Sequence, residues 1–224
     1  MYNLSGLCSN GVDSNVLFPR FLQINMTAAS ADRVQINRER LLQRFLSYVQ
    51  VGTSADPSSD GYPSSSGQWD LGKLLLEELR ALTIEDACQD EHALVWGTVP
   101  ASNGEQGPTV ALVAHLDTSP EAPGENVQPQ VIQSYGGGDI TLPSGNVIDA
   151  ASCPALKSML GMTLVTTDGN TLLGGDDKAG VAIIMEFVAT LVENPHLMHG
   201  PVKVLFTCDE EIGRGTDKID LEKL

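Results

Sequence analysis

The sequence predicts an α/β domain with a mixed, mostly parallel sheet flanked by helices. Segments with a helical spacing of apolar residues alternate along the chain with segments that are typical of strands. Two of the predicted strands contain unbroken apolar runs, "VALVA" and "VKVLF" (residues 110–114 and 202–206). Such runs favour strands that are buried on both faces of a sheet.

The first half of the chain supplies two predicted helices and two predicted strands. In "RERLLQRFLSYVQV", Leu41, Leu42, Phe45, Leu46 and Val49 form one apolar helix face. A loop rich in Ser, Gly and Pro follows, and then a second helix, "WDLGKLLLEELRAL". The helices are expected at residues 38–51 and 69–82, and the strands at 92–100 and 108–117.

The second half begins with an irregular segment, residues 119–167, which is rich in Gly and Pro. Asp168-Gly169 lies between two strand-like pieces and is typical of a hairpin turn. "KAGVAIIMEFVATLVENP" predicts a buried helix over 178–195, which Pro195 helps to end. The last expected strand covers 200–211 and finishes in three carboxylates.

Composition excludes some classes of protein. The net charge of −16 argues against a nucleic-acid partner, because phosphate binding needs a basic surface. No run of about 18 apolar residues occurs, so no membrane span is expected. The four cysteines are far apart in the sequence and favour reduced thiols in a cytoplasmic protein. Residues 1–35 have little periodicity and are expected to form a flexible N-terminal extension.

Chemically active side chains follow the two apolar strands. His115 and Asp117 have the i, i+2 spacing that places side chains on one side of a strand. A carboxylate beside a metal-binding histidine commonly fixes the orientation of the imidazole ring. By itself, however, such a pair is more often structural.

Two further acidic motifs have both a structural and a functional interpretation. In "GGDDKAG", Asp177 can cap the following helix, which leaves Asp176 free to reach into a cleft. In "CDEEIG", neighbouring residues of an extended chain point opposite ways, so Glu210 and Glu211 can have different roles. A helix cap and a solvated acidic loop are the structural alternatives. Together, the imidazole and the carboxylates suit Zn²⁺, and a shared carboxylate suits two metal ions.

These motifs resemble those of a known family. "HLDTSPEAPGENVQPQVIQSYGGGDI", "TLLGGDDKAG" and "FTCDEEIGRGTDKID" resemble the peptidase T group of M20 metallopeptidases, which are tripeptide aminopeptidases. "LLQRFLSYVQVGTSAD" is also similar to that family's beginning. The resemblance implies that residues 36–224 are the N-terminal part of a zinc-exopeptidase-like catalytic domain. It also implies that the lid or dimerisation domain and the C-terminal part of the family lie outside this sequence.

The resemblance also implies roles for individual residues. His115, Asp176 and Glu211 would bind two Zn²⁺ ions, with Asp176 shared between them. Asp117 would orient His115, and Glu210 would act as the general base. The implied substrates are small peptides, and the complete protein of this family could form a homodimer.

The family's remaining metal ligands lie beyond Leu224, so the 224-residue chain is expected to bind zinc weakly and to hydrolyse tripeptides poorly. Two alternatives stay open. The chain could belong to another M20 dipeptidase or amidohydrolase, or it could be a non-catalytic fragment or interaction protein.

Overall fold

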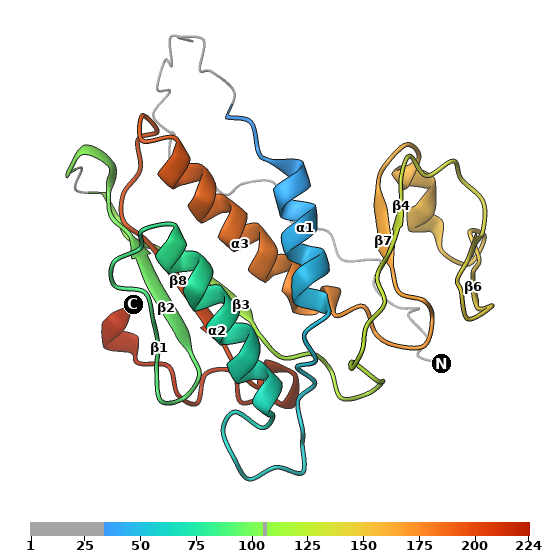
Figure 1. Cartoon of the computed structure of the whole chain (residues 1–224), viewed down its shortest axis with the longest axis horizontal. Coiled ribbons are helices and arrows are strands. Elements are labelled where there is room, and N and C mark those ends of the chain that lie inside the picture. The colour runs from blue at the N-terminus through green and yellow to red at the C-terminus, as the bar shows by residue number, and fades with distance from the viewer. Residues whose placement is uncertain (1–33, 105–106) are drawn as a thin grey trace, which may run out of the picture. The chain divides into compact units, whose positions relative to one another are not determined.

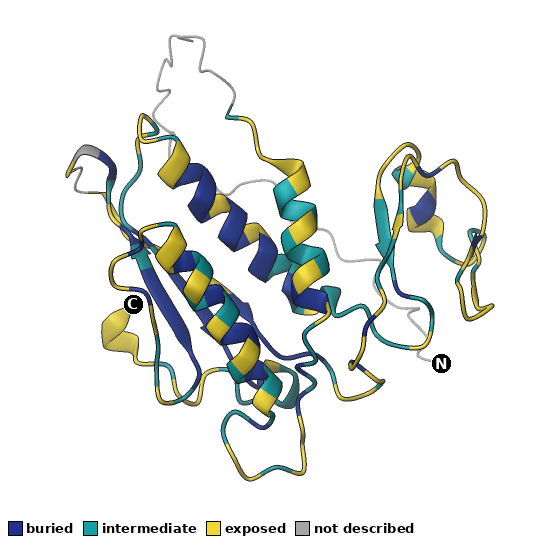
Figure 2. Cartoon of the chain, viewed as in Figure 1, coloured by how far each residue is buried: buried dark blue, intermediate teal, exposed yellow. Residues whose placement is uncertain are grey.

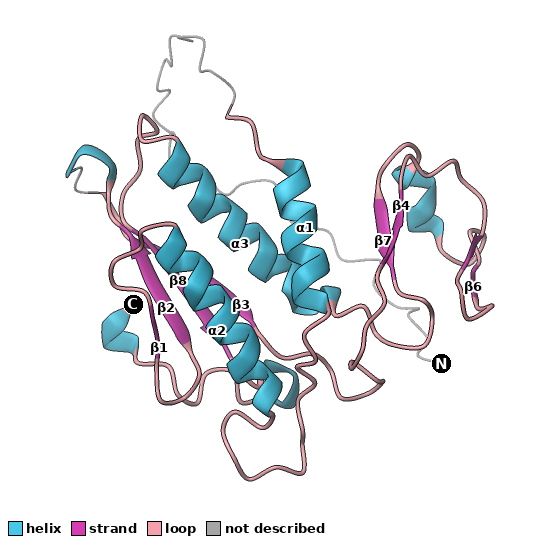
Figure 3. Cartoon of the chain, in the orientation of Figure 1, coloured by secondary structure: helices cyan, strands magenta, loops and turns pink. Residues whose placement is uncertain are grey.

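The computed structural model describes residues 34–104 and 107–224, and within these ranges it contains a mixed sheet of four strands. The strands lie in the order β1-β2-β8-β3, as Figures 1 and 3 show. Their bounds are Cys88–Gln89 (β1), Val95–Val99 (β2), Val110–His115 (β3) and Val202–Thr207 (β8). The predicted mixed α/β class is confirmed.

The expectation of mostly parallel pairing is wrong for the described strands. β3 and β8 are parallel, whereas β8–β2 and β2–β1 are antiparallel. Residues 90–94 form a tight turn between β1 and β2, and such a short connection can join only antiparallel neighbours. The parallel pair, in contrast, is joined by a long crossover that includes a helix.

Three α-helices in the described ranges pack on this sheet or on one another. Their bounds are Arg38–Val49 (α1), Ser66–Ala81 (α2) and Gly175–Glu193 (α3). In Figure 1, α2 and α3 lie in front of the sheet and α1 lies beside α3; α3 packs against β3 and β2, α2 against β1 and β2, and α1 against α3. Figure 2 shows the long buried face of α3, as its continuous apolar sequence predicts.

Helix α1 is tied to α3 by a buried carboxylate. The side chain of Glu186 is 3% exposed and accepts hydrogen bonds from Arg40 and Arg44 of α1. Arg44 also donates to Glu78 of α2, at 2.8 Å. One charged cluster therefore links all three helices, next to the shared apolar core.

The irregular segment between β3 and α3 has a small core of its own. It contains β4 (Gln130–Ile132), β5 (Ile140–Thr141), β6 (Val147–Ile148) and β7 (Leu164–Thr166), and Tyr135, Ile140 and Leu156 are buried in it. The expected hairpin around Asp168-Gly169 is wrong. β7 pairs with β4 instead, and the chain after Gly169 turns directly into α3.

Short 3-10 helices complete the described structure: η1 (Ser102–Gly104), η2 (Pro154–Met159), η3 (Glu210–Ile212) and η4 (Leu221–Lys223). No helix in the described ranges has the length and apolar character that crossing a bilayer requires. Cys88, Cys153 and Cys208 are free thiols. The predicted flexible extension over residues 1–35 falls almost entirely outside the described residues.

The start of α2 packs very closely against the loop after α1, and this contact gives a stability prediction. A Cβ atom added at Gly67 would lie 1.7 Å from the carbonyl oxygen of Gly52. Gly67→Ala is therefore expected to lower the free energy of unfolding by about 2–3 kcal/mol in urea titrations. Gly136→Ala is the control, because its Cβ would meet nothing within 4 Å. Equal effects of the two substitutions would contradict the steric argument.

Candidate metal centre

The parallel pairing of β3 and β8 brings two groups of polar residues to one edge of the sheet. His115, the last residue of β3, pairs in register with Thr207, the last residue of β8. The acidic residues that follow β8 therefore begin beside the imidazole. Ligand sites of α/β sheets are commonly found outside the carboxyl ends of such strands.

The start of α3 brings the third group. Residues 176 and 177 have non-helical backbone angles, and regular helix begins after them. The Asp177 carboxylate accepts the N–H of Gly180 at 3.1 Å, as expected for a helix cap. Asp176 is not used as a cap; its side chain is 84% exposed and reaches His115.

Both ring nitrogens of His115 face oxygen acceptors. Nδ1 lies 3.0 Å from the backbone carbonyl oxygen of Asp117 and 3.4 Å from its carboxylate, and Nε2 lies 3.0 Å from Oδ1 of Asp176. Only an imidazolium, with a proton on each nitrogen, can donate to both sides. A cation placed between Nε2 and Asp176 would take the place of one proton.

The pKa of His115 agrees with this geometry. Burial by itself lowers the pKa, but hydrogen bonding to Asp117 and its charge, followed by Asp176, outweigh burial and raise it to about 9. Burial also raises the pKa of Glu211; the neighbouring carboxylates add to this rise, and His115 opposes it. The site thus holds several carboxylates whose mutual repulsion favours a bound cation.

His115, Asp176 and Glu211 form a group that could hold a metal ion. One ligand atom from each lies within 4.8 Å of the others. Imidazole and carboxylate ligands suit Zn²⁺, and the donor set therefore fits the metal that the sequence implies.

Asp117 and Glu210 adjoin this group. Asp117 is fully buried, and its two carboxylate oxygens accept the N–H groups of Glu210 and Glu211, both at 3.0 Å. Oε2 of Glu210 lies 3.8 Å from Nε2 of His115, and its side chain is 59% exposed. All five residues singled out in the sequence therefore lie at one edge of the sheet.

The expected extended backbone at Glu210 and Glu211 is wrong. Asp209 has a φ of 59°, which ends the strand, and residues 210–212 form the short helix η3. The side chains of the two glutamates therefore point in directions that differ by about one third of a helical turn, and not to opposite faces as in a strand.

Lys178 does not join the acidic residues that precede it. Its side chain is buried and donates to the carbonyl oxygen of Val51 at 2.6 Å. Burial lowers its pKa to about 8, against the opposing charge of Glu125. The lysine in "GGDDKAG" thus links the start of α3 to the loop after α1 through this hydrogen bond.

Comparisons with known proteins identify the family of the chain. The family model for "Peptidase family M20/M25/M40" matches residues 165–220, which include Asp176, Glu210 and Glu211. Peptidase T of Geobacillus thermodenitrificans is 47% identical over 186 residues, covering 82% of this chain and 45% of that protein. We therefore place the chain in the M20 family, as a partial match of the peptidase T type.

Other relatives give the same result. Peptidase T of Bacillus subtilis is 43% identical over 188 residues, covering 83% of this chain and 46% of that protein. The crystal structure of a tripeptidase from Staphylococcus aureus has a TM-score of 0.59 and 25% identity, covering 84% of this chain and 41% of that one. An aminopeptidase PepT from Bacillus cereus gives the same values. The chain spans slightly less than half the length of the curated relatives it matches.

Proposed function

We propose that this chain carries part of the two-zinc site of an aminopeptidase that removes the N-terminal residue of tripeptides. The observation that carries the proposal is the convergence of His115, Asp176 and Glu211 from three separate segments. Peptidase T relatives and the tripeptidase neighbour support the choice of substrate. On this proposal, residues 36–224 are the N-terminal part of the catalytic domain.

His115 would bind the first zinc ion, Glu211 the second, and Asp176 both. Bound zinc would polarise the scissile carbonyl group and make an attacking water more acidic. The side chain of Glu210 is more than half exposed and 3.8 Å from His115, so it can meet this water without a change of fold. Its carboxylate would accept the proton of the water and pass it to the leaving amine.

Asp117 would keep the imidazole in one orientation. Its backbone carbonyl oxygen lies closer to Nδ1 of His115 than its carboxylate does, at 3.0 against 3.4 Å. Nδ1–H would donate to this residue, which leaves Nε2 to face the metal. The carboxylate itself accepts hydrogen bonds from two N–H groups of η3, those of Glu210 and Glu211.

The location and the assembly stay predictions. The free thiols of Cys88, Cys153 and Cys208 support a cytoplasmic location, since disulfides are rare in that compartment. A homodimer of the complete protein is proposed from the family resemblance alone.

Zinc titration and a substrate panel test the proposed function. Isothermal titration calorimetry of the purified chain is expected to detect zinc binding. In the presence of zinc, slow release of the N-terminal residue is expected from tripeptides, and less from dipeptides or N-acyl amino acids. Faster hydrolysis of dipeptides or N-acyl amino acids would favour another M20 hydrolase. A chain that binds no zinc would overturn the proposal.

A further inference from the structure

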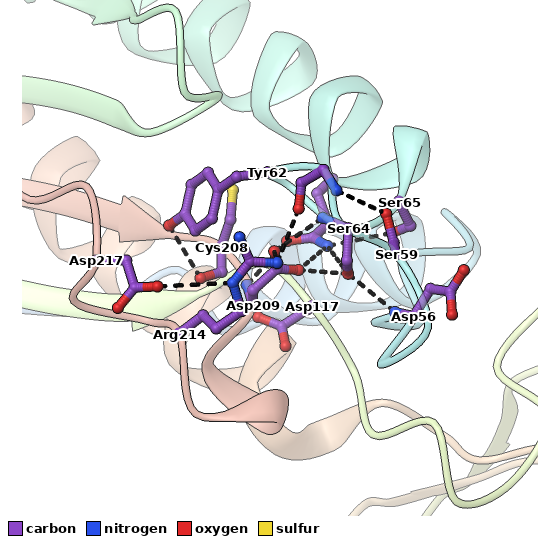
Figure 4. Close-up of polar contacts among 12 residues, drawn as sticks. Asp56, Ser59, Tyr62, Ser64, Ser65, Asp117, Cys208, Asp209, Arg214 and Asp217 are labelled. Atoms are coloured by element: carbon purple, nitrogen blue, oxygen red, sulfur yellow. Dashed lines mark hydrogen bonds and ion pairs between the residues drawn. The ribbon is translucent and has the colours of Figure 1, made fainter.

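Asp209 is a buried carboxylate for which the proposed reaction has no role. It is 0% exposed and immediately precedes Glu210. Oδ1 accepts hydrogen bonds from Oγ of Ser64 at 2.6 Å and from Nε2 of Gln68 at 2.7 Å, and Oδ2 accepts the N–H of Ser64 at 2.8 Å. Figure 4 shows Ser64 and Asp209 facing each other inside this network.

The backbone of Asp209 is held as firmly as its side chain. Its N–H donates to Oε1 of Gln68 at 3.1 Å, and its carbonyl oxygen accepts the N–H of Arg214 at 2.9 Å. Gln68 thus binds Asp209 with both ends of its amide, so the amide has one allowed orientation. We call Ser64, Gln68 and Asp209 the Asp209 clamp.

Arg214 and Tyr62 connect the same two segments at the rim of the clamp. Arg214 donates to the carbonyl oxygen of Gly61 at 2.8 Å and lies over the ring of Tyr62. The hydroxyl of Tyr62 donates to the carbonyl oxygen of Cys208 at 3.2 Å, as Figure 4 shows. The chain on both sides of Asp209 is therefore fixed to the loop before α2.

The clamp determines where the next two residues point. Asp209 has a left-handed backbone conformation, which turns the chain away from the direction of β8. Directly after this turn, the N–H groups of Glu210 and Glu211 meet the two oxygens of Asp117. A change at Asp209 would therefore move both glutamates relative to His115.

We propose that Asp209 is a positioning residue for the metal centre. Held by Ser64 and Gln68, it orients the 210–211 turn so that its N–H groups bind Asp117 and its carboxylates stay beside His115. This inference rests on the proposed function for the role of the glutamates, but the geometry of the turn can be tested without metal.

Asp209→Asn is the informative substitution. Asparagine tolerates the left-handed conformation almost as well as aspartate, so the backbone preference is kept. The new amide N–H₂ group, however, is itself a hydrogen-bond donor. It would face Ser64 and Gln68, which both donate to the carboxylate of Asp209. Gln68 cannot turn over to compensate, because its oxygen accepts the N–H of residue 209.

The first measurement is hydrogen exchange of the Glu210 and Glu211 amides, followed by NMR in the metal-free chain. Exchange of both amides is expected to become at least about tenfold faster in Asp209→Asn, because their hydrogen bonds to a carboxylate weaken. Ser64→Ala removes only a hydroxyl group and is also expected to speed the exchange of both amides. It keeps the test available if the first variant does not fold. Ile84→Val, which trims a buried core side chain, is the control and should leave both rates within about twofold.

The second measurement is zinc affinity, determined by competition with a chromophoric chelator. Asp209→Asn is expected to weaken zinc binding about tenfold, while Ile84→Val leaves it unchanged. Unchanged amide exchange and unchanged affinity in Asp209→Asn and Ser64→Ala, with lowered melting temperatures, would show a purely structural network and overturn the proposal. If the wild-type chain binds no zinc, the proposed function fails, and amide exchange still decides whether Asp209 positions the turn.

Discussion

Asp176→Asn is expected to weaken zinc binding by at least about 100-fold. Loss of an outer-shell partner costs metal sites about 10–100-fold, and a direct carboxylate ligand contributes more than such a partner. Asp176 lies 3.0 Å from Nε2 of His115 and is the residue proposed to contact both ions. Chelator competition at constant pH and ionic strength measures the change.

The matched control for this prediction is the neighbouring residue. Asp177→Asn makes the same chemical change one position later, where the side chain caps α3 through Gly180. Asparagine caps helices as well as aspartate, so zinc affinity is expected to stay within about fivefold of the wild type. If the two substitutions weaken binding equally, the ion is attracted by the general negative charge and not by a defined ligand.

Glu186→Gln is expected to lower the free energy of unfolding by about 3 kcal/mol. The Glu186 carboxylate is buried and accepts hydrogen bonds from Arg40 and Arg44, at 2.7–2.8 Å. A neutral amide in its place would leave two guanidinium groups close together, with only the more exposed carboxylates of Glu78 and Glu193 to compensate their charge. Removal of one partner from a buried ion pair typically costs 3–5 kcal/mol, so about 3 kcal/mol is a cautious value. Urea unfolding followed by circular dichroism measures it.

Glu193→Gln tests whether burial of the Glu186 carboxylate explains the large loss of stability expected for Glu186→Gln. Glu193 contacts the same Arg40 from the last turn of α3, but its side chain is 50% exposed. Exposed ion pairs contribute about 0–1 kcal/mol, so a loss of less than 1 kcal/mol is expected. A loss as large as that of Glu186→Gln would mean that the number of contacts to Arg40, and not burial, determines the stability.

Most of the fold could be predicted from apolar spacing. The helices α1, α2 and α3 and the strands β2, β3 and β8 all lie where the sequence predicts them, within a few residues at their ends. The direction of pairing could not be predicted so well, because it depends on how connections cross the sheet. The hairpin expected at Asp168-Gly169 is wrong because a turn signal is local and does not determine the partner of a strand. The partner of β7 is β4, which lies over 30 residues earlier in the chain.

The grouping of candidate ligands could be predicted because each motif follows a strand or begins a helix. The Asp209 clamp could not, because "SSSGQ" is typical of an exposed loop. Only the folded chain shows that Ser64 and Gln68 are buried against Asp209, over 140 residues away. The 3-10 turn at Glu210 could not be predicted either. The strand pattern predicts extended chain as far as Glu211, whereas β8 ends at Thr207.

The three candidate ligands occupy positions 115, 176 and 211, on the end of β3, the start of α3 and the turn after β8. In a denatured chain these groups are far apart on average, and high affinity for a divalent ion exists only once the sheet and α3 have assembled. Ion uptake and folding are consequently linked equilibria, so free zinc would act on this chain as a thermodynamic stabiliser of its native state.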